Sequence, residues 1–301
     1  TAWSTLLLLR HRMRSLRSGA VRHLDRLAGG GMVPADRRQR PRSVLPNRQA
    51  LDSGMAANRK CSMRDLAGIT VAITGASAGI GAASAKALVA EGANVVLGAR
   101  RVERMEALAD AFGTQVAFVE MDVRRPEDSR SLVQQAVSSF GRLDALVANA
   151  GIGAYGGIMD LTDEQLAVMM DTNIAGTVWP IRAAVPLFLD QGEGDIVIVA
   201  SVAGLRGAGD EAVYAATKFA QVGLAGGLDR ELRDENIRIS TLAPGGTATE
   251  FAMGAGRTPD MPGLDDMMRA EDVAHAVVTV LKQPKSMRTL LWSMRSIKEA
   301  D

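Results

Sequence analysis

Residues 68–97 carry a strand, a glycine-rich turn, a helix and a second strand in about thirty positions. Residues 69–73 read I-T-V-A-I, an apolar run rich in β-branched side chains, as in a buried parallel strand. The turn T-G-A-S-A-G-I-G spans residues 74–81, and the Ala-rich stretch after it ends at Gly92. Residues 94–97 read N-V-V-L. This order predicts a βαβ unit, and therefore a parallel sheet with a crossover helix.

The glycines of this turn have separate physical reasons to be there. Gly75 permits a tight turn off the strand, Gly79 lets the backbone approach a phosphate, and Gly81 lets the helix pack closely. A pyrophosphate would then lie at the helix N-terminus, beside Ser77 and Ile80, where free N–H groups and the helix dipole favour an anion. The alternative is a purely structural turn, which the position after a first strand disfavours.

The second strand ends in G-A-R-R, with no acidic residue where an NAD site usually has one for the ribose 2′-hydroxyl. Arg100 and Arg101 stand there instead, and guanidinium groups pair well with phosphate. We therefore expect NADP(H) to be favoured over NAD(H). The alternative is that the two arginines only begin a solvated helix.

Further apolar runs follow at regular intervals, and helical stretches alternate with them. This alternation predicts an α/β fold, a Rossmann-like doubly wound parallel sheet in a single domain. Ligands of such sheets bind beyond the carboxyl ends of the strands. The expected strands are residues 115–120, 143–148, 195–200, 237–242 and 289–292.

Composition narrows the protein class. The chain has 301 residues, 47% of them hydrophobic and 23% charged, which suits one large globular domain. No apolar run approaches the ~18 residues that a membrane-spanning helix needs. A single cysteine, Cys61, fits a reducing compartment, so we expect a cytoplasmic protein. The three histidines and Cys61 form no ligand cluster, so no metal site is expected.

Residues 1–62 differ from the rest of the chain. They hold thirteen Lys plus Arg and three Asp, a net charge of +10, whereas residues 63–301 carry −9. We expect a disordered or non-native basic extension, and the initial Thr suggests a fragment or an over-extended reading frame. An organelle transit peptide and a basic arm for nucleic acid or anionic lipid are the alternatives. Residues 63–301 are the expected catalytic domain.

An Ala-rich stretch, residues 212–220, contains one of only two tyrosines in the chain, Tyr214, and a lysine four positions later, Lys218. On a helix these two side chains share one face. An ammonium group beside a phenol favours the phenolate, which is useful in an active site and has no use in a core.

The chain resembles the short-chain dehydrogenase/reductase family, in the group with subunits of about 250 residues. The resemblance covers roughly residues 64–300, and it depends on several motifs that occur in the family's order and spacing. These are T-G-A-S-A-G-I-G (74–81), D-V (122–123), A-N-A-G (148–151), Asn173, Ser201, Y-A-A-T-K (214–218) and P-G-G-T-A-T (244–249).

The resemblance implies four catalytic residues. Tyr214 would be the general acid/base at the reacting oxygen. Lys218, together with the positive charge of the oxidised nicotinamide, would lower the pKa of Tyr214, and Lys218 would also hold the nicotinamide ribose. Ser201 would stabilise charge on that oxygen, although Ala200 replaces a serine that is frequent in the family. Asn173 would hold a water in a proton relay to Lys218.

The resemblance also implies cofactor contacts from the ends of three further strands. The family often has two asparagines before A-G, and in this chain Ala148 replaces the first of them while Asn149 is the second. The implied contacts are Asp122 and Val123 at the adenine, Asn149 and Gly151 at the adenosine ribose, Pro244 and Gly245 beneath the nicotinamide, and Thr247 and Thr249 at the carboxamide and pyrophosphate.

The substrate side is less defined. Residues 250–267 are rich in Gly, Pro and Met, and we expect a lid over the substrate, with a solvated surface loop as the alternative. Together with Tyr155, Ile158 and Met159, this segment should form a substrate pocket that favours an apolar alcohol or ketone.

These features predict an NADP(H)-dependent oxidoreductase that acts on a carbonyl or secondary alcohol. The alternatives are an NAD(H)-dependent alcohol dehydrogenase of the same family, a non-catalytic nucleotide sensor, and a nucleic-acid-binding protein that uses the basic arm. Ser201 has no convincing His and acid beside it, which argues against a serine hydrolase. The resemblance also implies that residues 163–188 and 210–233 pair between subunits in a homodimer or homotetramer.

Overall fold

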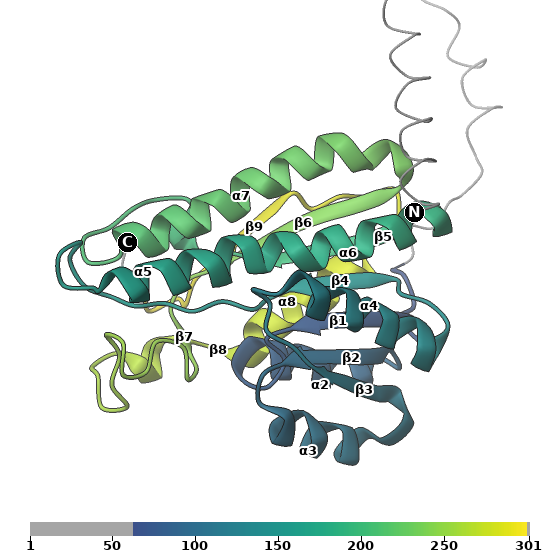
Figure 1. Cartoon of the computed structure of the whole chain (residues 1–301), viewed down its shortest axis with the longest axis horizontal. Coiled ribbons are helices and arrows are strands. Elements are labelled where there is room, and N and C mark those ends of the chain that lie inside the picture. Colours follow the sequence, from purple (N-terminus) through teal and green to yellow (C-terminus); the bar gives the residue numbers. More distant parts are fainter. Residues whose placement is uncertain (1–62, 300–301) are drawn as a thin grey trace, which may run out of the picture. The chain divides into compact units, whose positions relative to one another are not determined.

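Seven parallel strands form the central sheet of the protein, whose computed structural model describes residues 63–299 (Figure 1). The strand order is β3-β2-β1-β4-β5-β6-β9, so the direction of winding reverses between β1 and β4. This confirms the predicted doubly wound parallel sheet. The predicted basic extension lies outside the described residues. The strands are β1 (Thr70–Thr74), β2 (Asn94–Ala99), β3 (Val116–Glu120), β4 (Ala145–Ala148), β5 (Gly194–Val199), β6 (Ile237–Pro244) and β9 (Leu291–Met294).

Burial explains why these runs are strands. Every residue of β1, β4, β5 and β6 is buried, as expected for parallel strands that are covered on both faces. Their apolar, largely β-branched side chains fill both sides of the sheet. The fourth strand starts at Ala145 rather than at the predicted residue 143. Just before it, the Asp144 carboxylate accepts a hydrogen bond from Thr70 N at 2.8 Å.

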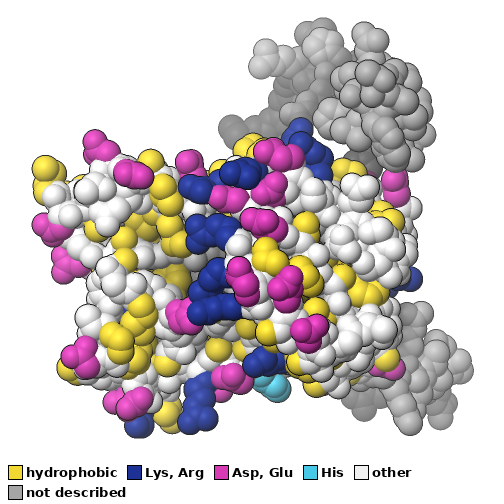
Figure 2. Space-filling model, turned by 60° about the horizontal axis from the view of Figure 1, so that its bottom comes forward, with side chains coloured by type: hydrophobic (Ala, Val, Ile, Leu, Met, Phe, Trp, Pro, Cys, Tyr) yellow, Lys and Arg dark blue, Asp and Glu magenta, His cyan; other side chains and the backbone are white. Residues whose placement is uncertain are grey.

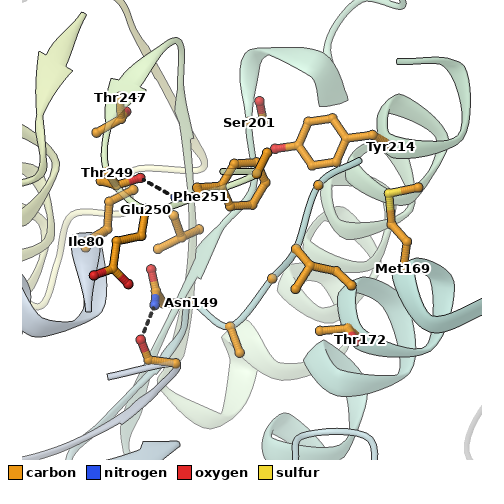
Figure 3. Close-up of a pocket in the computed structure, with 18 of the residues that line it drawn as sticks. Ile80, Asn149, Met169, Thr172, Ser201, Tyr214, Thr247, Thr249, Glu250 and Phe251 are labelled. Atoms are coloured by element: carbon orange, nitrogen blue, oxygen red, sulfur yellow. Dashed lines mark hydrogen bonds between the residues drawn. The ribbon is translucent and has the colours of Figure 1, made fainter. Parts of the chain in front are cut away.

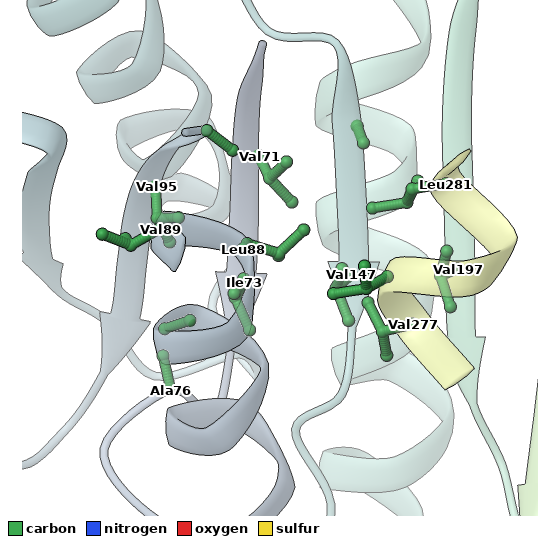
Figure 4. Close-up of a cluster of buried hydrophobic side chains, with 14 of the residues drawn as sticks. Val71, Ile73, Ala76, Leu88, Val89, Val95, Val147, Val197, Val277 and Leu281 are labelled. Carbon is green, nitrogen blue, oxygen red and sulfur yellow. The ribbon is translucent and has the colours of Figure 1, made fainter. Parts of the chain in front are cut away.

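Helices cover both faces of this sheet. One buried cluster joins the strands to α2, α3 and α8, and Figure 4 shows Leu88, Val277 and Leu281 reaching from the helices towards Val71 and Val147 of the sheet. A second cluster joins the opposite face to α4, α6 and α7. The helices are α2 (Gly79–Ala90), α3 (Val102–Phe112), α4 (Pro126–Phe140), α5 (Asp163–Met170), α6 (Gly176–Gln191), α7 (Ala212–Leu232) and α8 (Ala270–Lys282).

The long helix expected over residues 163–188 is interrupted. A capping box of Thr162 and Gln165 starts α5, and a π-helical turn, Asp171–Ala175, separates α5 from α6. Such a turn widens the helix and changes its carbonyl pairing, and π turns are frequent at functional sites. Here it contains the predicted site residue Asn173, which is fully buried.

A small parallel pair holds the base of the expected lid. It consists of β7 (Thr247–Ala248) and β8 (Met268–Arg269), with Thr247 beside Met268. The loop between these two strands is irregular, as its composition predicts, and Figure 1 shows it extending away from the sheet. Among residues 63–299, no helix is long and apolar enough to cross a membrane.

Candidate active site

A cavity of about 810 Å³ lies at the carboxyl ends of the strands, where the winding of the sheet reverses (Figure 3). It collects residues that follow each strand of the central sheet, and ligands of doubly wound sheets bind at this edge. Of the predicted site residues, Gly81 and Asn173 do not line it. Those that do are Gly75, Ser77, Gly79, Ile80, Arg100, Arg101, Asp122, Val123, Asn149, Gly151, Ser201, Tyr214, Lys218, Pro244, Gly245, Thr247 and Thr249.

The glycine-rich turn has room for a phosphate and none for side chains. Gly75 has φ 67°, and a Cβ there would lie 2.8 Å from Ala150 Cα. A Cβ on Gly81 would lie 2.4 Å from the Gly75 carbonyl oxygen. No side chain of residues 63–299 caps the N-terminus of α2, so its first N–H groups face the cavity without a side-chain acceptor. These features fit the pyrophosphate of a dinucleotide.

An unexpected acidic residue, Glu250, pairs with Arg101 and with Arg104. Arg101 donates through Nε to Ser77 Oγ at 3.1 Å and forms a 2.8 Å ion pair with Glu250, which also pairs with Arg104 at 2.8 Å. The two guanidinium groups lower the pKa of Glu250. Arg101 is also the residue directly before α3. It therefore lines the cavity and begins a helix at the same time, so the two alternatives given for it do not exclude each other. Arg100 is exposed and lines the same cavity.

At the expected adenine end, Asp122 is held by its neighbour. Arg124 donates from Nε to the Asp122 carboxylate at 2.9 and 3.0 Å. This hydrogen bonding lowers the pKa of Asp122 to about 2, so the carboxylate is ionised at every physiological pH.

Ser201, Tyr214 and Lys218 meet at the other end of the cavity. Ser201 lies two residues after the end of β5. The Tyr214 phenol points towards it from the first turn of α7 (Figure 3). Tyr214 is only 6% exposed, and Lys218 Nζ lies 5.7 Å from its ring centroid. The sequence-based prediction that these three side chains converge agrees with this geometry.

Within the protein's own groups, the pKa of Tyr214 is set mainly by burial, and the predicted lowering by Lys218 together with the oxidised nicotinamide stays a prediction. Burial raises the pKa of Tyr214, and Tyr155 raises it further, while a hydrogen bond with Ser201 opposes the rise. Burial also lowers the pKa of Lys218 to about 7. An ammonium that is only partly protonated near neutral pH cannot offset the desolvation of the phenolate.

Asn173 is linked to Lys218 through a residue that the sequence analysis missed, Gln221. Asn173 Oδ1 accepts from Ile152 N at 2.8 Å, and its Nδ2 donates to Thr217 Oγ1 at 3.0 Å. Gln221 Nε2 donates to the Asn173 carbonyl oxygen at 2.9 Å, and Gln221 Oε1 accepts from Lys218 Nζ at 3.0 Å. The polar side chain of Gln221, one turn after Lys218 on an Ala-rich face, was the signal that could have revealed it.

Three side chains surround Tyr214 on the expected substrate side. Ring centroids of Tyr155 and Phe251 lie 5.8 and 5.7 Å from that of Tyr214, and the Arg257 guanidinium lies 5.8 Å from both flanking rings. Phe251 and Arg257 come from the irregular loop between β7 and β8, which supports its expected position over the site. Sequence reasoning did not single out either residue.

Two of the expected wall residues lie elsewhere. Ile158 is 59% exposed and Met159 is 89% exposed, and neither lines the cavity. The expectation that they form an apolar wall is wrong, because the turn that contains them points outward from the cavity. Tyr155, from the same segment, does line it.

The fold and the cavity together define a nicotinamide-dinucleotide-dependent oxidoreductase, and the comparisons specify which kind. The short chain dehydrogenase family matches residues 69–260, and the chain belongs to this family. It is an oxidoreductase that acts with NAD(P).

Individual relatives agree with this assignment. The oxidoreductase asL5 of Sarocladium schorii is 38% identical over 191 residues, which cover 64% of this chain and 77% of that protein. An alcohol dehydrogenase of Thermococcus sibiricus, solved with 5-hydroxy-NADP, superposes with TM-score 0.71 at 30% identity and covers 77% of this chain and 98% of its own. A 3-ketoacyl-(acyl-carrier-protein) reductase of Brucella melitensis, solved with NADH, gives TM-score 0.71 at 29% identity, with coverages of 77% and 99%.

Proposed function

We propose that the protein transfers a hydride between NADP(H) and a carbonyl or secondary alcohol, with Tyr214 as the general acid/base. The observation that carries this proposal is the convergence of Ser201, Tyr214 and Lys218 in the cavity that also contains the glycine-rich turn. A nucleotide sensor without turnover has no need for a buried phenol and lysine at this place.

Each side chain has a definite task in this mechanism. The bound nicotinamide supplies or accepts the hydride. Ser201 and Tyr214 hold the substrate oxygen, and Tyr214 donates its proton to that oxygen during reduction. The raised pKa of Tyr214 keeps the phenol protonated at neutral pH, which suits this donor role. Behind Tyr214, a chain of hydrogen bonds that runs from Lys218 through Gln221 to the Asn173 carbonyl holds the Lys218 ammonium in place.

NADP(H) rather than NAD(H) is proposed from the charges at the adenosine end. Arg100 and Arg101 line the cavity beside the glycine-rich turn, and Ser77 bonds Arg101. Among similar structures, one contains 5-hydroxy-NADP and another NADH, so the arginines carry this part of the proposal. Arg101→Gln should weaken NADPH binding at least tenfold and NADH binding much less, measured by fluorescence titration. Equal losses would contradict the proposed 2′-phosphate contact.

The other proposed site residues keep the roles expected above. We propose Asp122, Val123, Asn149 and Gly151 at the adenosine end, Pro244 and Gly245 beneath the nicotinamide, and Thr247 and Thr249 at its carboxamide and the pyrophosphate. All of them line the one cavity, which supports a single continuous cofactor site.

The proposed chemistry is tested by Tyr214→Phe. This change removes one hydroxyl from a buried ring, so it should abolish turnover while the affinity for NADPH stays within about threefold. Tyr155→Phe is the matched comparison, because Tyr155 is the only other tyrosine and its ring lies 5.8 Å away. Its effect on the turnover of an uncharged carbonyl compound should be far smaller. Residual turnover above one per cent in Tyr214→Phe would contradict the assignment.

A small-molecule substrate and a homo-oligomer complete the proposal, and a cytoplasmic location stays a prediction from cysteine usage. Basic and acidic side chains alternate across the face in Figure 2. That face therefore does not offer the continuous basic surface that nucleic-acid binding favours. The basic arm of the alternative reading lies outside the described residues.

A further inference from the structure

Arg257 is an unusual lining residue for an otherwise aromatic part of the cavity. Its guanidinium lies 5.8 Å from the ring centroids of both Tyr155 and Phe251, and its NH1 group donates to the Thr247 carbonyl oxygen at 3.1 Å. The positive charge of Arg257 also lowers the pKa of the Tyr155 hydroxyl, against the larger effect of burial. The guanidinium is thus oriented by two rings and one carbonyl.

Within the described part of the chain, no carboxylate neutralises this guanidinium. None of the ion pairs formed within residues 63–299 includes Arg257. Glu211 lines the same cavity, but Arg206 is the charge that stabilises its ionised form. Arg257 instead acts on the catalytic end, because its positive charge lowers the pKa of both Tyr155 and Tyr214. A partly buried arginine without an acidic partner is well suited to bind an anion.

We propose that Arg257, together with the Tyr155 hydroxyl, binds the carboxylate of the substrate, so that the enzyme acts on short oxo acids and the corresponding hydroxy acids. This inference rests on the proposed function. Tyr155 and Phe251 flank both Tyr214 and Arg257, so the phenol and the guanidinium lie beside the same two rings. One small substrate can therefore contact both groups. The sequence alone favoured an uncharged apolar substrate instead.

The reaction balances without a further reactant. In reduction, the carbonyl carbon takes the hydride from the bound nicotinamide, and the carbonyl oxygen takes the proton of Tyr214, which solvent later replaces. The carbonyl becomes a secondary alcohol, and the carboxylate leaves the reaction unchanged. Arg257 contributes orientation and binding only, since it cannot be deprotonated in a protein.

The decisive experiment compares an acid with its own ester. Reduction of 3-oxobutanoate and of methyl 3-oxobutanoate by NADPH is measured with wild type, Arg257→Met and Arg257→Lys. Wild type should prefer the acid, and Arg257→Met should lose roughly 10- to 100-fold in kcat/KM for the acid with little change for the ester. Arg257→Lys should recover part of the preference. Arg230→Met, an exposed arginine on α7, serves as the control.

A binding measurement separates this inference from the proposed function. Butanoate, which cannot react, should raise the melting temperature of wild type bound to NADP⁺, whereas butan-1-ol should not, and Arg257→Met should abolish the difference. If no carbonyl compound is reduced but butanoate still binds through Arg257, the proposed function fails and the anion site stands. If the ester is reduced as well as the acid, and Arg257→Met instead weakens NADPH binding, the anion-site proposal is overturned.

Discussion

Lys218 is the most deeply buried ionisable residue among the proposed catalytic groups. It is 3% exposed, and its ammonium bonds the Val199 carbonyl and the Gln221 amide oxygen. Burial therefore lowers its pKa to about 7, compared with ~10.4 in an unfolded chain. Catalysis near neutral pH can use a lysine of this kind in either protonation state.

The pKa of Lys218 predicts a pH-dependent stability cost. Between about pH 7 and pH 10 the unfolded chain binds more protons than the folded chain, so the free energy of unfolding rises with pH because of this residue. Below pH 7 the full cost of burying the ammonium is present. Lys218→Met should therefore stabilise the protein at pH 6 by about 1–3 kcal/mol.

Urea denaturation of both proteins from pH 6 to pH 10 checks this prediction. The advantage of Lys218→Met should shrink as pH rises and vanish or reverse near pH 10, where wild-type Lys218 is neutral and still hydrogen-bonded. A difference that stays constant across the range would show that Lys218 is charged throughout.

At the scale of elements, the glycine-rich turn before α2 affects both the stability of the fold and the binding of the cofactor. The close approach of Gly81 to the Gly75 carbonyl leaves no space for a Cβ, so Gly81→Ala must displace the start of α2. We predict a loss of more than about 2 kcal/mol in the free energy of unfolding and a large loss of cofactor affinity.

Gly223→Ala is the matched control for this prediction. Gly223 lies inside α7, and a Cβ added there would meet nothing within 4 Å, so alanine should stabilise the helix by about 0.5–1 kcal/mol. Thermal unfolding and NADPH titration measure both variants. Equal tolerance at the two glycines would contradict the packing argument for the turn.

Elements with a regular hydrophobic period could be predicted from the sequence. The side-chain contacts made by the irregular segments could not. The strands of the sheet and the glycine turn are encoded locally, so their positions agree with the prediction to within a few residues. Glu250 and Arg257 were missed because their partners are fixed by tertiary structure: Glu250 pairs with Arg101 across 149 positions. Nothing local distinguishes these charges from those of a solvated loop.

The π turn was missed for a related reason. Residues 163–188 have the composition of one continuous helix. In the widened turn at Asp171–Ala175, Asn173 instead donates hydrogen bonds to Ile152 and Thr217, which come from distant parts of the chain. Motif order, in contrast, placed Ser201, Tyr214 and Lys218 correctly in one cavity, because parallel strands bring their carboxyl ends to one edge.

At the scale of the whole molecule, α7 offers a surface for assembly. Phe219 on this helix is 47% exposed, next to an otherwise small-residue face, and we predict that it is covered by a second copy of the chain. Phe219→Asp should lower the mass measured by light scattering to that of a monomer. Val137→Asp, at a similarly exposed residue of α4, should not. A wild-type monomer at micromolar concentration would contradict the predicted homo-oligomer.

The direct test of the proposed chemistry follows the hydride itself. The protein is incubated with a carbonyl compound and NADPH that carries deuterium at both C4 positions, and the alcohol is analysed by mass spectrometry. We predict one deuterium on the carbinol carbon with wild type and no labelled alcohol with Tyr214→Phe. An alcohol formed without the label, or an equal yield of labelled alcohol from Tyr214→Phe, would contradict hydride transfer assisted by this phenol.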